Sequence, residues 1–179
     1  MKKTIFMVAM AALIASCGNK SKQEATSLAG TDTTATANES ALPQYQDFEQ
    51  ADPSGKMMKL SQFVGNNKLT LVDFWASWCP PCRAEMPNLV KAYGEFKDKG
   101  LEIVGVSLDE DKAAWTGALE QMNMTWPQMS DLQGWDNAAA ALYGVRGIPH
   151  TLLINQKGEI VAQNLRGEDL HRVIAEYLK

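Results

Sequence analysis

Residues 69–83 read LTLVDFWASWCPPCR, and the interpretation of the whole chain starts from this stretch. Its first seven residues, 69–75, are apolar, β-branched or aromatic apart from one acid, which predicts a buried strand. The Pro80-Pro81 pair predicts a helix start, because proline is tolerated where the first N–H groups of a helix have no internal partner. The stretch therefore predicts a strand, a tight turn and a helix start that bring two cysteines to the mouth of a helix.

The spacing of Cys79 and Cys82 predicts thiol–disulfide chemistry. Two intervening residues place the second thiol one helical turn behind the first, close enough to bond with it. The partial positive charge of a helix N-terminus, together with the Arg83 cation, stabilises a thiolate on Cys79. Such a thiolate is a nucleophile near neutral pH and a good leaving group on the return step. The alternative is half of a structural zinc site, which needs a second pair of ligands. The only histidines, His150 and His171, are far apart in sequence, so thiol–disulfide chemistry is the preferred interpretation.

Two carboxyl groups near the cysteines are candidate proton carriers. Asp73 lies inside the predicted strand, where burial would raise its pKa and let it accept a proton from Cys82. Glu85 follows Cys82 by one helical turn, and a solvated surface position explains it equally well. A charged group inside an apolar strand is hard to explain structurally, so Asp73 is the stronger candidate.

Residues 72–83 resemble the active-site segment of the thioredoxin superfamily, and Pro80-Pro81 with the AEMP sequence at 84–87 resembles its membrane-anchored TlpA/ResA-like branch. The resemblance implies a thiol–disulfide oxidoreductase that needs no cofactor and no metal. In it, Cys79 attacks a disulfide of a client protein and Cys82 resolves the mixed disulfide.

The segment that ends at Pro149 resembles the cis-proline loop that faces the cysteines in this superfamily. The resemblance implies that client proteins bind along Trp78, Pro80, Pro81, Ile148, Pro149 and His150. His150 departs from the family pattern, where a threonine is common. It could tune the thiolate, bind an anionic group, or be an incidental surface histidine.

The N-terminal part of the chain predicts an export signal followed by a tether. Residues 1–17 combine two lysines with an apolar stretch too short to span a bilayer comfortably, and 14–17 resemble a lipobox in which Cys17 is acylated. An uncleaved anchor or an ordinary secretory signal is the alternative. Residues 18–42 are polar and predict a flexible tether, which leaves 43–179 as one thioredoxin-like domain. The expected location is the bacterial cell envelope, with the domain facing the periplasm and held to the membrane by lipid.

The predicted fold is an α/β, thioredoxin-like three-layer sandwich with a central mixed sheet, an N-terminal β-hairpin and a helix-strand insertion. The expected elements are a hairpin around a turn at 52–55, a strand at 69–75, a helix from 80 to about 99, a strand at 101–107, a helix ending at 122, an extended piece at 125–127, a helix at 134–143, strands at 151–154 and 159–162, and a helix at 168–178. In the last helix, Leu170, Val173, Ile174 and Tyr177 are expected to face inward.

The resemblance also implies partners. Disulfide-containing envelope proteins, among them apocytochrome c, are the expected clients, and a membrane thiol–disulfide protein is the expected electron donor. The net charge of −4 and the absence of a basic stripe argue against nucleic acid, and a monomer is expected. Three alternatives stay open: a disulfide oxidase or isomerase, a peroxiredoxin-like peroxidase, and a metal-binding lipoprotein. Met122, Met124 and Met129 could bind copper, but core packing is the preferred interpretation.

Overall fold

The computed structural model describes residues 41–179. The predicted signal at 1–17, its Cys17 and almost all of the predicted tether at 18–42 lie outside the described residues. None of the helices within 41–179 combines the length and the apolar character needed to cross a bilayer.

A five-stranded mixed sheet forms the centre of the domain, with the strands in the order β5-β4-β3-β6-β7. The predicted strand at 69–75 is confirmed as β3, which occupies the middle of the sheet with every residue buried. It pairs parallel with β4 and antiparallel with β6, as expected for a mixed sheet. The five strands are β3 (Leu69–Trp75), β4 (Leu101–Ser107), β5 (Gln128–Met129), β6 (His150–Asn155) and β7 (Ile160–Gln163).

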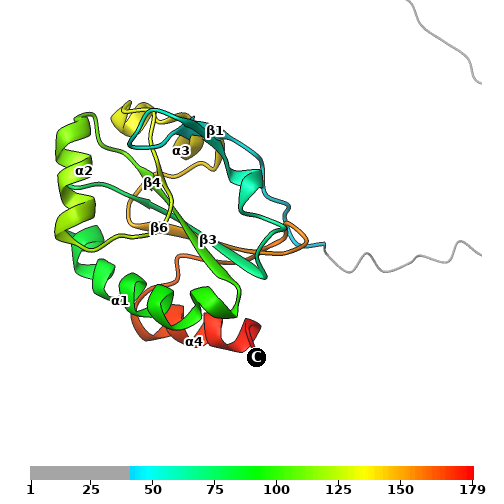
Figure 1. The fold of residues 1–179 in the computed structure, drawn as a ribbon. Helices are drawn as coiled ribbons and strands as arrows, with labels where there is room; N and C mark the ends of the chain where they lie inside the picture. The colour runs from blue at the N-terminus through cyan, green and yellow to red at the C-terminus, as the bar shows by residue number, and fades with distance from the viewer. Residues whose placement is uncertain (1–40) are drawn as a thin grey trace, which may run out of the picture. The chain divides into compact units, whose positions relative to one another are not determined.

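Helices cover the sheet, as Figure 1 shows: α1 and α4 lie side by side on one face, while α3 and β1 lie on the other. The predicted helix start at the Pro-Pro pair is confirmed, since α1 begins at Pro80 with Cys79 as its N-cap. The predicted hairpin is also confirmed as an antiparallel pair. The elements are β1 (Glu49–Ala51), β2 (Met57–Lys59), α1 (Pro80–Phe96), α2 (Lys112–Gln121), α3 (Ala138–Leu142) and α4 (Gly167–Tyr177), with short 3-10 turns η1 (Leu60–Gln62), η2 (Lys97–Lys99) and η3 (Gly134–Asp136).

Three details differ from the sequence-based expectations. The single helix predicted at 134–143 is wrong: it divides into η3 and α3, because the Asn137 side chain accepts the Ala140 N–H and starts a new helix. The short extended piece expected at 125–127 becomes β5 a little later, at Gln128. Tyr177, expected to face inward, is 49% exposed. Leu178, four residues after Ile174, packs against the core in its place.

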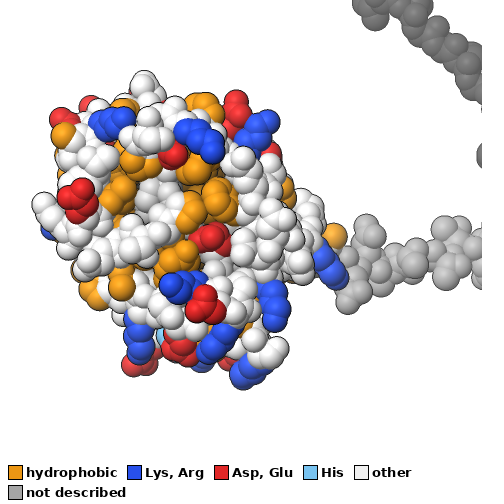
Figure 2. All heavy atoms as spheres, in the orientation of Figure 1, with side chains coloured by type: hydrophobic (Ala, Val, Ile, Leu, Met, Phe, Trp, Pro, Cys, Tyr) orange, Lys and Arg blue, Asp and Glu red, His pale blue; other side chains and the backbone are white. Residues whose placement is uncertain are grey.

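The three methionines of the insertion pack as expected. Met129 is fully buried, Met124 is nearly so, and Met122 packs against the core. Figure 2 shows hydrophobic side chains gathered around a hollow on the face between α2 and the β1–β2 hairpin. A groove of about 460 Å³ on the domain is lined by Met58, Phe63, Leu119, Met124 and their neighbours. The methionines therefore belong to the packing of the insertion, which confirms the preferred interpretation.

Candidate active site

The two thiols stand at the start of α1, directly after the central strand. Cys79 and Cys82 form a disulfide with a Cα–Cα distance of 5.3 Å. The Cys82 backbone N–H donates to the Cys79 sulfur at 3.2 Å, as the N-cap position requires. Cys79 is 3% exposed whereas Cys82 is fully buried, so an incoming sulfur reaches Cys79 first. This N–H donor and the helix N-terminus both favour a thiolate at Cys79.

The proline loop faces this disulfide. The Ile148–Pro149 peptide bond is cis, which confirms the expected cis-proline loop. The Cys79 sulfur lies 3.8 Å from the Ile148 carbonyl oxygen. The Pro149 carbonyl oxygen in turn accepts a hydrogen bond of 2.5 Å from the Arg166 guanidinium, which comes from the segment before α4. The loop is thus held between the cysteines on one side and the β7–α4 connection on the other.

The expected burial of Asp73 is confirmed. Its side chain is fully buried in the middle of β3, and neither carboxyl oxygen has a hydrogen-bond partner among the described residues. The pKa of Asp73 is raised to about 7, chiefly by desolvation and then by the negative charge of Glu85, while the positive charge of Arg166 opposes the rise. A carboxyl group with this pKa exchanges protons near neutral pH, which suits an acid–base group.

Glu85 is half-buried rather than fully solvated. Its carboxylate accepts the Gly167 backbone N–H at 2.6 Å, at the N-terminus of α4, where a negative charge is favoured. This contact ties α1 to α4. It also keeps the Glu85 charge close enough to raise the pKa of Asp73. Glu85 therefore acts on the site through its neighbours in this structure.

His150 begins β6 and is half-buried, so the expectation of an incidental surface histidine does not describe it. Its ring lies 6.0 Å from the Phe74 ring, and its buried Nε2 has no hydrogen-bond partner among the described residues. Burial lowers the pKa of His150, and the Arg166 charge lowers it further. A neutral imidazole is a weak ligand for an anionic group, so this environment favours packing beside the proline loop over anion binding, and tuning of the thiolate stays a prediction.

The remaining predicted client-binding residues form an open surface beside Cys79. Pro80 and Pro81 are exposed in the first turn of α1, and Trp78 is 51% exposed. Trp135, which the sequence interpretation did not include, lies with its ring centroid 6.2 Å from that of Trp78. It comes from η3, and no pattern in the sequence links it to Trp78.

Asp109 was also missed as part of the site. It is nearly fully buried and accepts hydrogen bonds from the Ser77 hydroxyl (2.5 Å), the Ser77 N–H (3.0 Å) and the Ser107 hydroxyl (2.7 Å). These bonds hold the turn before Cys79 against the end of β4. A signal was available, since β3 and β4 are parallel and the residues after their carboxyl ends meet at one edge of the sheet.

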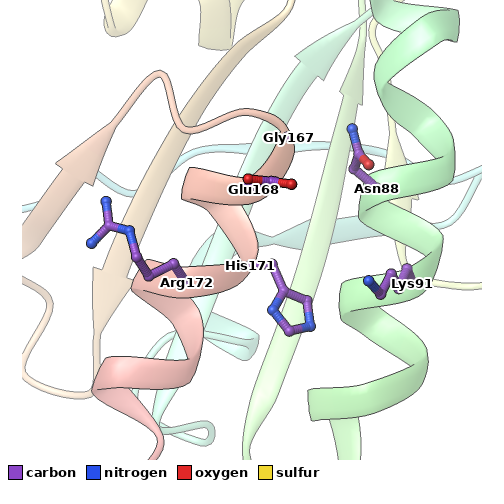
Figure 3. A pocket seen from close by; sticks show the side chains of 6 residues that line it. All are labelled: Asn88, Lys91, Gly167, Glu168, His171 and Arg172. Carbon is purple, nitrogen blue, oxygen red and sulfur yellow. The ribbon is translucent and has the colours of Figure 1, made fainter.

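A second concavity, of about 160 Å³, lies between α1 and α4 and contains no cysteine (Figure 3). Asn88 and Lys91 on α1 face Glu168 and His171 on α4 across it, whereas the Arg172 side chain points away from α1. Two of its charged groups are paired outside it, with His171 contacting Glu95 at 2.6 Å and Arg172 contacting Asp169 at 2.8 Å, whereas Lys91 and Glu168 have no ion-pair partner among the described residues. We interpret it as the seam between two packed helices. Over residues 41–179, no three His, Cys, Asp or Glu side chains gather in a way that could hold a metal ion.

Comparison with known proteins supports the same thiol–disulfide chemistry as this geometry. Residues 43–163 match the AhpC/TSA family. A thiol-disulfide oxidoreductase ResA from Bacillus thuringiensis subsp. konkukian is 33% identical over 133 residues, which cover 74% of this chain and 73% of that protein.

Two solved structures are similar in fold and sequence. The thioredoxin domain of a thiol-disulfide oxidoreductase from Bacteroides vulgatus superposes with a TM-score of 0.71 at 34% identity, covering 78% of this chain and 98% of that one. A thiol:disulfide interchange protein from a Bacteroides species gives a TM-score of 0.69 at 34% identity, covering 77% and 90%. The family match, the curated relative and the paired thiols at the helix start all agree, and the chain belongs to the AhpC/TSA family, on its thiol–disulfide oxidoreductase branch.

Proposed function

We propose that this protein is a protein-disulfide reductase of the bacterial envelope. The observation that carries the proposal is the disulfide of Cys79 and Cys82 at the start of α1, with its outer sulfur against the Ile148 carbonyl of the cis-proline loop. An N-cap thiol, a facing loop that can hold an extended chain, and a buried acid with a pKa near neutrality are the parts that disulfide exchange needs.

The reduced enzyme acts in two steps. The Cys79 thiolate attacks one sulfur of a client disulfide, the client S–S bond breaks, and the client's other sulfur leaves as a thiolate that takes a proton from water. Asp73, ionised in part near neutral pH, accepts the proton of the Cys82 thiol. The Cys82 thiolate then attacks the Cys79 sulfur, which releases the second client thiolate and forms the Cys79–Cys82 disulfide. Two electrons thus pass to the client, and a membrane thiol–disulfide protein returns them.

The cellular setting is part of the proposal. A lipid on Cys17 and a tether at 18–42 would keep the domain at a membrane while letting it reach clients on the periplasmic side. The relative named as a thiol-disulfide oxidoreductase supports clients that contain disulfides, and apocytochrome c is the candidate that the sequence resemblance implied. The proposed direction, reduction of clients, corresponds to a redox potential nearer to that of thioredoxin than to that of DsbA in a titration against glutathione.

Trapping of mixed disulfides tests the roles of the two cysteines. The full-length chain carrying Cys82→Ser should accumulate covalent complexes with client proteins through Cys79, whereas Cys79→Ser should not. Both variants carry Cys17→Ser, so that the third cysteine cannot contribute a thiol. Equal trapping by the two variants, or none by either, would contradict the assignment of Cys79 as the attacking thiol.

A further inference from the structure

A groove runs from the exposed side of Trp78 to the start of α2, immediately beside the attacking thiol. It has a volume of about 370 Å³ and is lined by Ser77, Trp78, Asp109, Glu110, Asp111 and Ala114. Trp135 extends it, because its ring packs against that of Trp78. We call these seven residues the aromatic–acidic groove. We propose that it binds a lysine or arginine side chain of the client polypeptide close to the disulfide that Cys79 attacks, an inference that rests on the proposed reductase function.

The two tryptophans provide an aromatic surface that nothing in the described part of the chain covers. Trp78 and Trp135 are each 51% exposed, although their rings lie only 6.2 Å apart at an interplanar angle of 54°. Large aromatic side chains exposed together are typical of contact surfaces. Tryptophan is also the side chain that attracts a cation most strongly over its ring face. Two tilted indoles therefore suit an alkylammonium or a guanidinium better than a small neutral group.

The opposite wall of the groove is acidic. Of the six residues that line it, three are acids and none is basic. Asp109 is occupied by its two serines, and the Asp111 carboxylate accepts a backbone N–H in the first turn of α2. Glu110 is exposed and has no hydrogen-bond partner among the described residues, which leaves its charge available to a ligand.

Glu110 lies against the residue that precedes the second tryptophan in the chain. Its carboxylate rests on Gly134, where an added Cβ would lie 2.5 Å from the Glu110 oxygen. Gly134 has a φ of +58°, a conformation that glycine adopts easily and other residues rarely adopt. Trp135 follows directly in the chain. A glycine at 134 thus lets the acid lie against the backbone segment that carries the second indole.

The charge of the groove selects its occupant. Arg83 approaches this segment from α1 and donates to the Ser77 carbonyl oxygen at 3.4 Å, but it does not line the groove. An anionic client residue would face the three acids, whereas a cationic residue would meet them together with two indole faces. Because Cys79 follows Trp78 in the chain, a side chain held in the groove belongs to a residue near the attacked cysteine of the client.

Matched peptides test this inference on the reduced full-length chain. Three short peptides with one intramolecular disulfide carry Lys, Gln or Glu next to the same cysteine, and the second-order rate constant of disulfide exchange is measured for each. Each rate is divided by that of dithiothreitol with the same peptide, because a neighbouring charge also changes the reactivity of the peptide cysteine itself. We expect the corrected Lys-to-Gln ratio to be about three to ten, and to fall toward one in 0.5 M salt.

Variants link the preference to the groove. Trp135→Ala and Glu110→Gln should each lower the Lys-to-Gln ratio by at least twofold. Tyr177→Ala, an exposed aromatic on α4, and Glu120→Gln, an exposed acid on α2, are the matched controls and should leave the ratio unchanged.

Corrected rates that are equal for the Lys and Gln peptides would overturn the inference while leaving the proposed function standing. A ratio that neither groove variant changes would also overturn it. If none of the peptides reacts, the proposed reductase function itself fails.

Discussion

The buried carboxyl of Asp73 makes the stability of this protein depend on pH in a way that one substitution should remove. The pKa of Asp73 is raised from 3.8 to about 7 in the folded protein, chiefly by desolvation. Between these two values the folded state binds a proton that the unfolded state has lost. The contribution of Asp73 to stability is therefore fully present below pH 4, is lost as the pH rises through 7, and stays constant above that. Asp73→Asn removes this dependence.

The size of the effect follows from the two pKa values. A rise of about three units corresponds to about 4 kcal/mol between the low-pH and high-pH limits, at about 1.36 kcal/mol per unit. Over the practical range from pH 5 to pH 8, about 2–3 kcal/mol of this change remains, because part of the loss has already occurred at pH 5. The asparagine also leaves an unpaired buried amide, but that penalty does not vary with pH. Between pH 5 and pH 8, the difference in unfolding free energy between variant and wild type should therefore shift by about 2–3 kcal/mol in favour of the variant.

Urea unfolding of the oxidised full-length chain at half-unit intervals from pH 5 to pH 8 measures this shift. The oxidised form is used because disulfide-bonded cysteines do not titrate, so neither thiol adds its own pH dependence. Asp98→Asn is the control, since Asp98 is exposed and its variant should follow the wild type at every pH. A difference for Asp73→Asn that stays constant within about 0.5 kcal/mol across the range would refute the argument that burial raises the pKa of this carboxyl.

Three further substitutions probe the surroundings of the site. Glu85→Gln removes a charge that raises the pKa of Asp73, so the pH-dependent loss of stability should move to lower pH when the same titration is repeated; an unchanged midpoint would contradict that coupling. Leu89→Ala empties a fully buried position on α1 and should cost about 2–5 kcal/mol in urea unfolding, a loss below 1 kcal/mol being the contrary result. Gly105→Ala puts a methyl group against the side chain of Gln128, which accepts the buried indole N–H of Trp75 at 3.1 Å; we expect a loss of about 1–3 kcal/mol, and no loss would show that this contact relaxes freely.

The sequence predicted the central elements of the fold because their signals are local. The apolar run of β3 and the Pro-Pro start of α1 each depend on a few adjacent residues, and both agree with the structure within a residue. The insertion was harder to predict. The pattern from 134 to 143 resembles a single helix. In the structure the Asn137 side chain accepts the Ala140 N–H and caps a new helix, which divides the segment in two. At the end of α4, Leu178 packs against the core and Tyr177 is exposed, a difference that depends on how the helix packs on the sheet.

The chemistry of the two cysteines could be predicted from the sequence, because its signals lie within eleven consecutive residues, 73–83. These signals are the spacing of the thiols, the start of the helix and the acid within an apolar strand. The surroundings of those thiols were decided by tertiary structure. Arg166 reaches the Pro149 carbonyl, Glu85 binds the N-terminus of α4, and Trp135 packs on Trp78, each across a distance that no periodicity spans. Desolvation and pairing between distant charges are properties of the folded sheet and its helices. For that reason the size of the rise in the pKa of Asp73, whose direction the sequence predicted, and the acidic, aromatic character of the groove could be established only once the chain was folded.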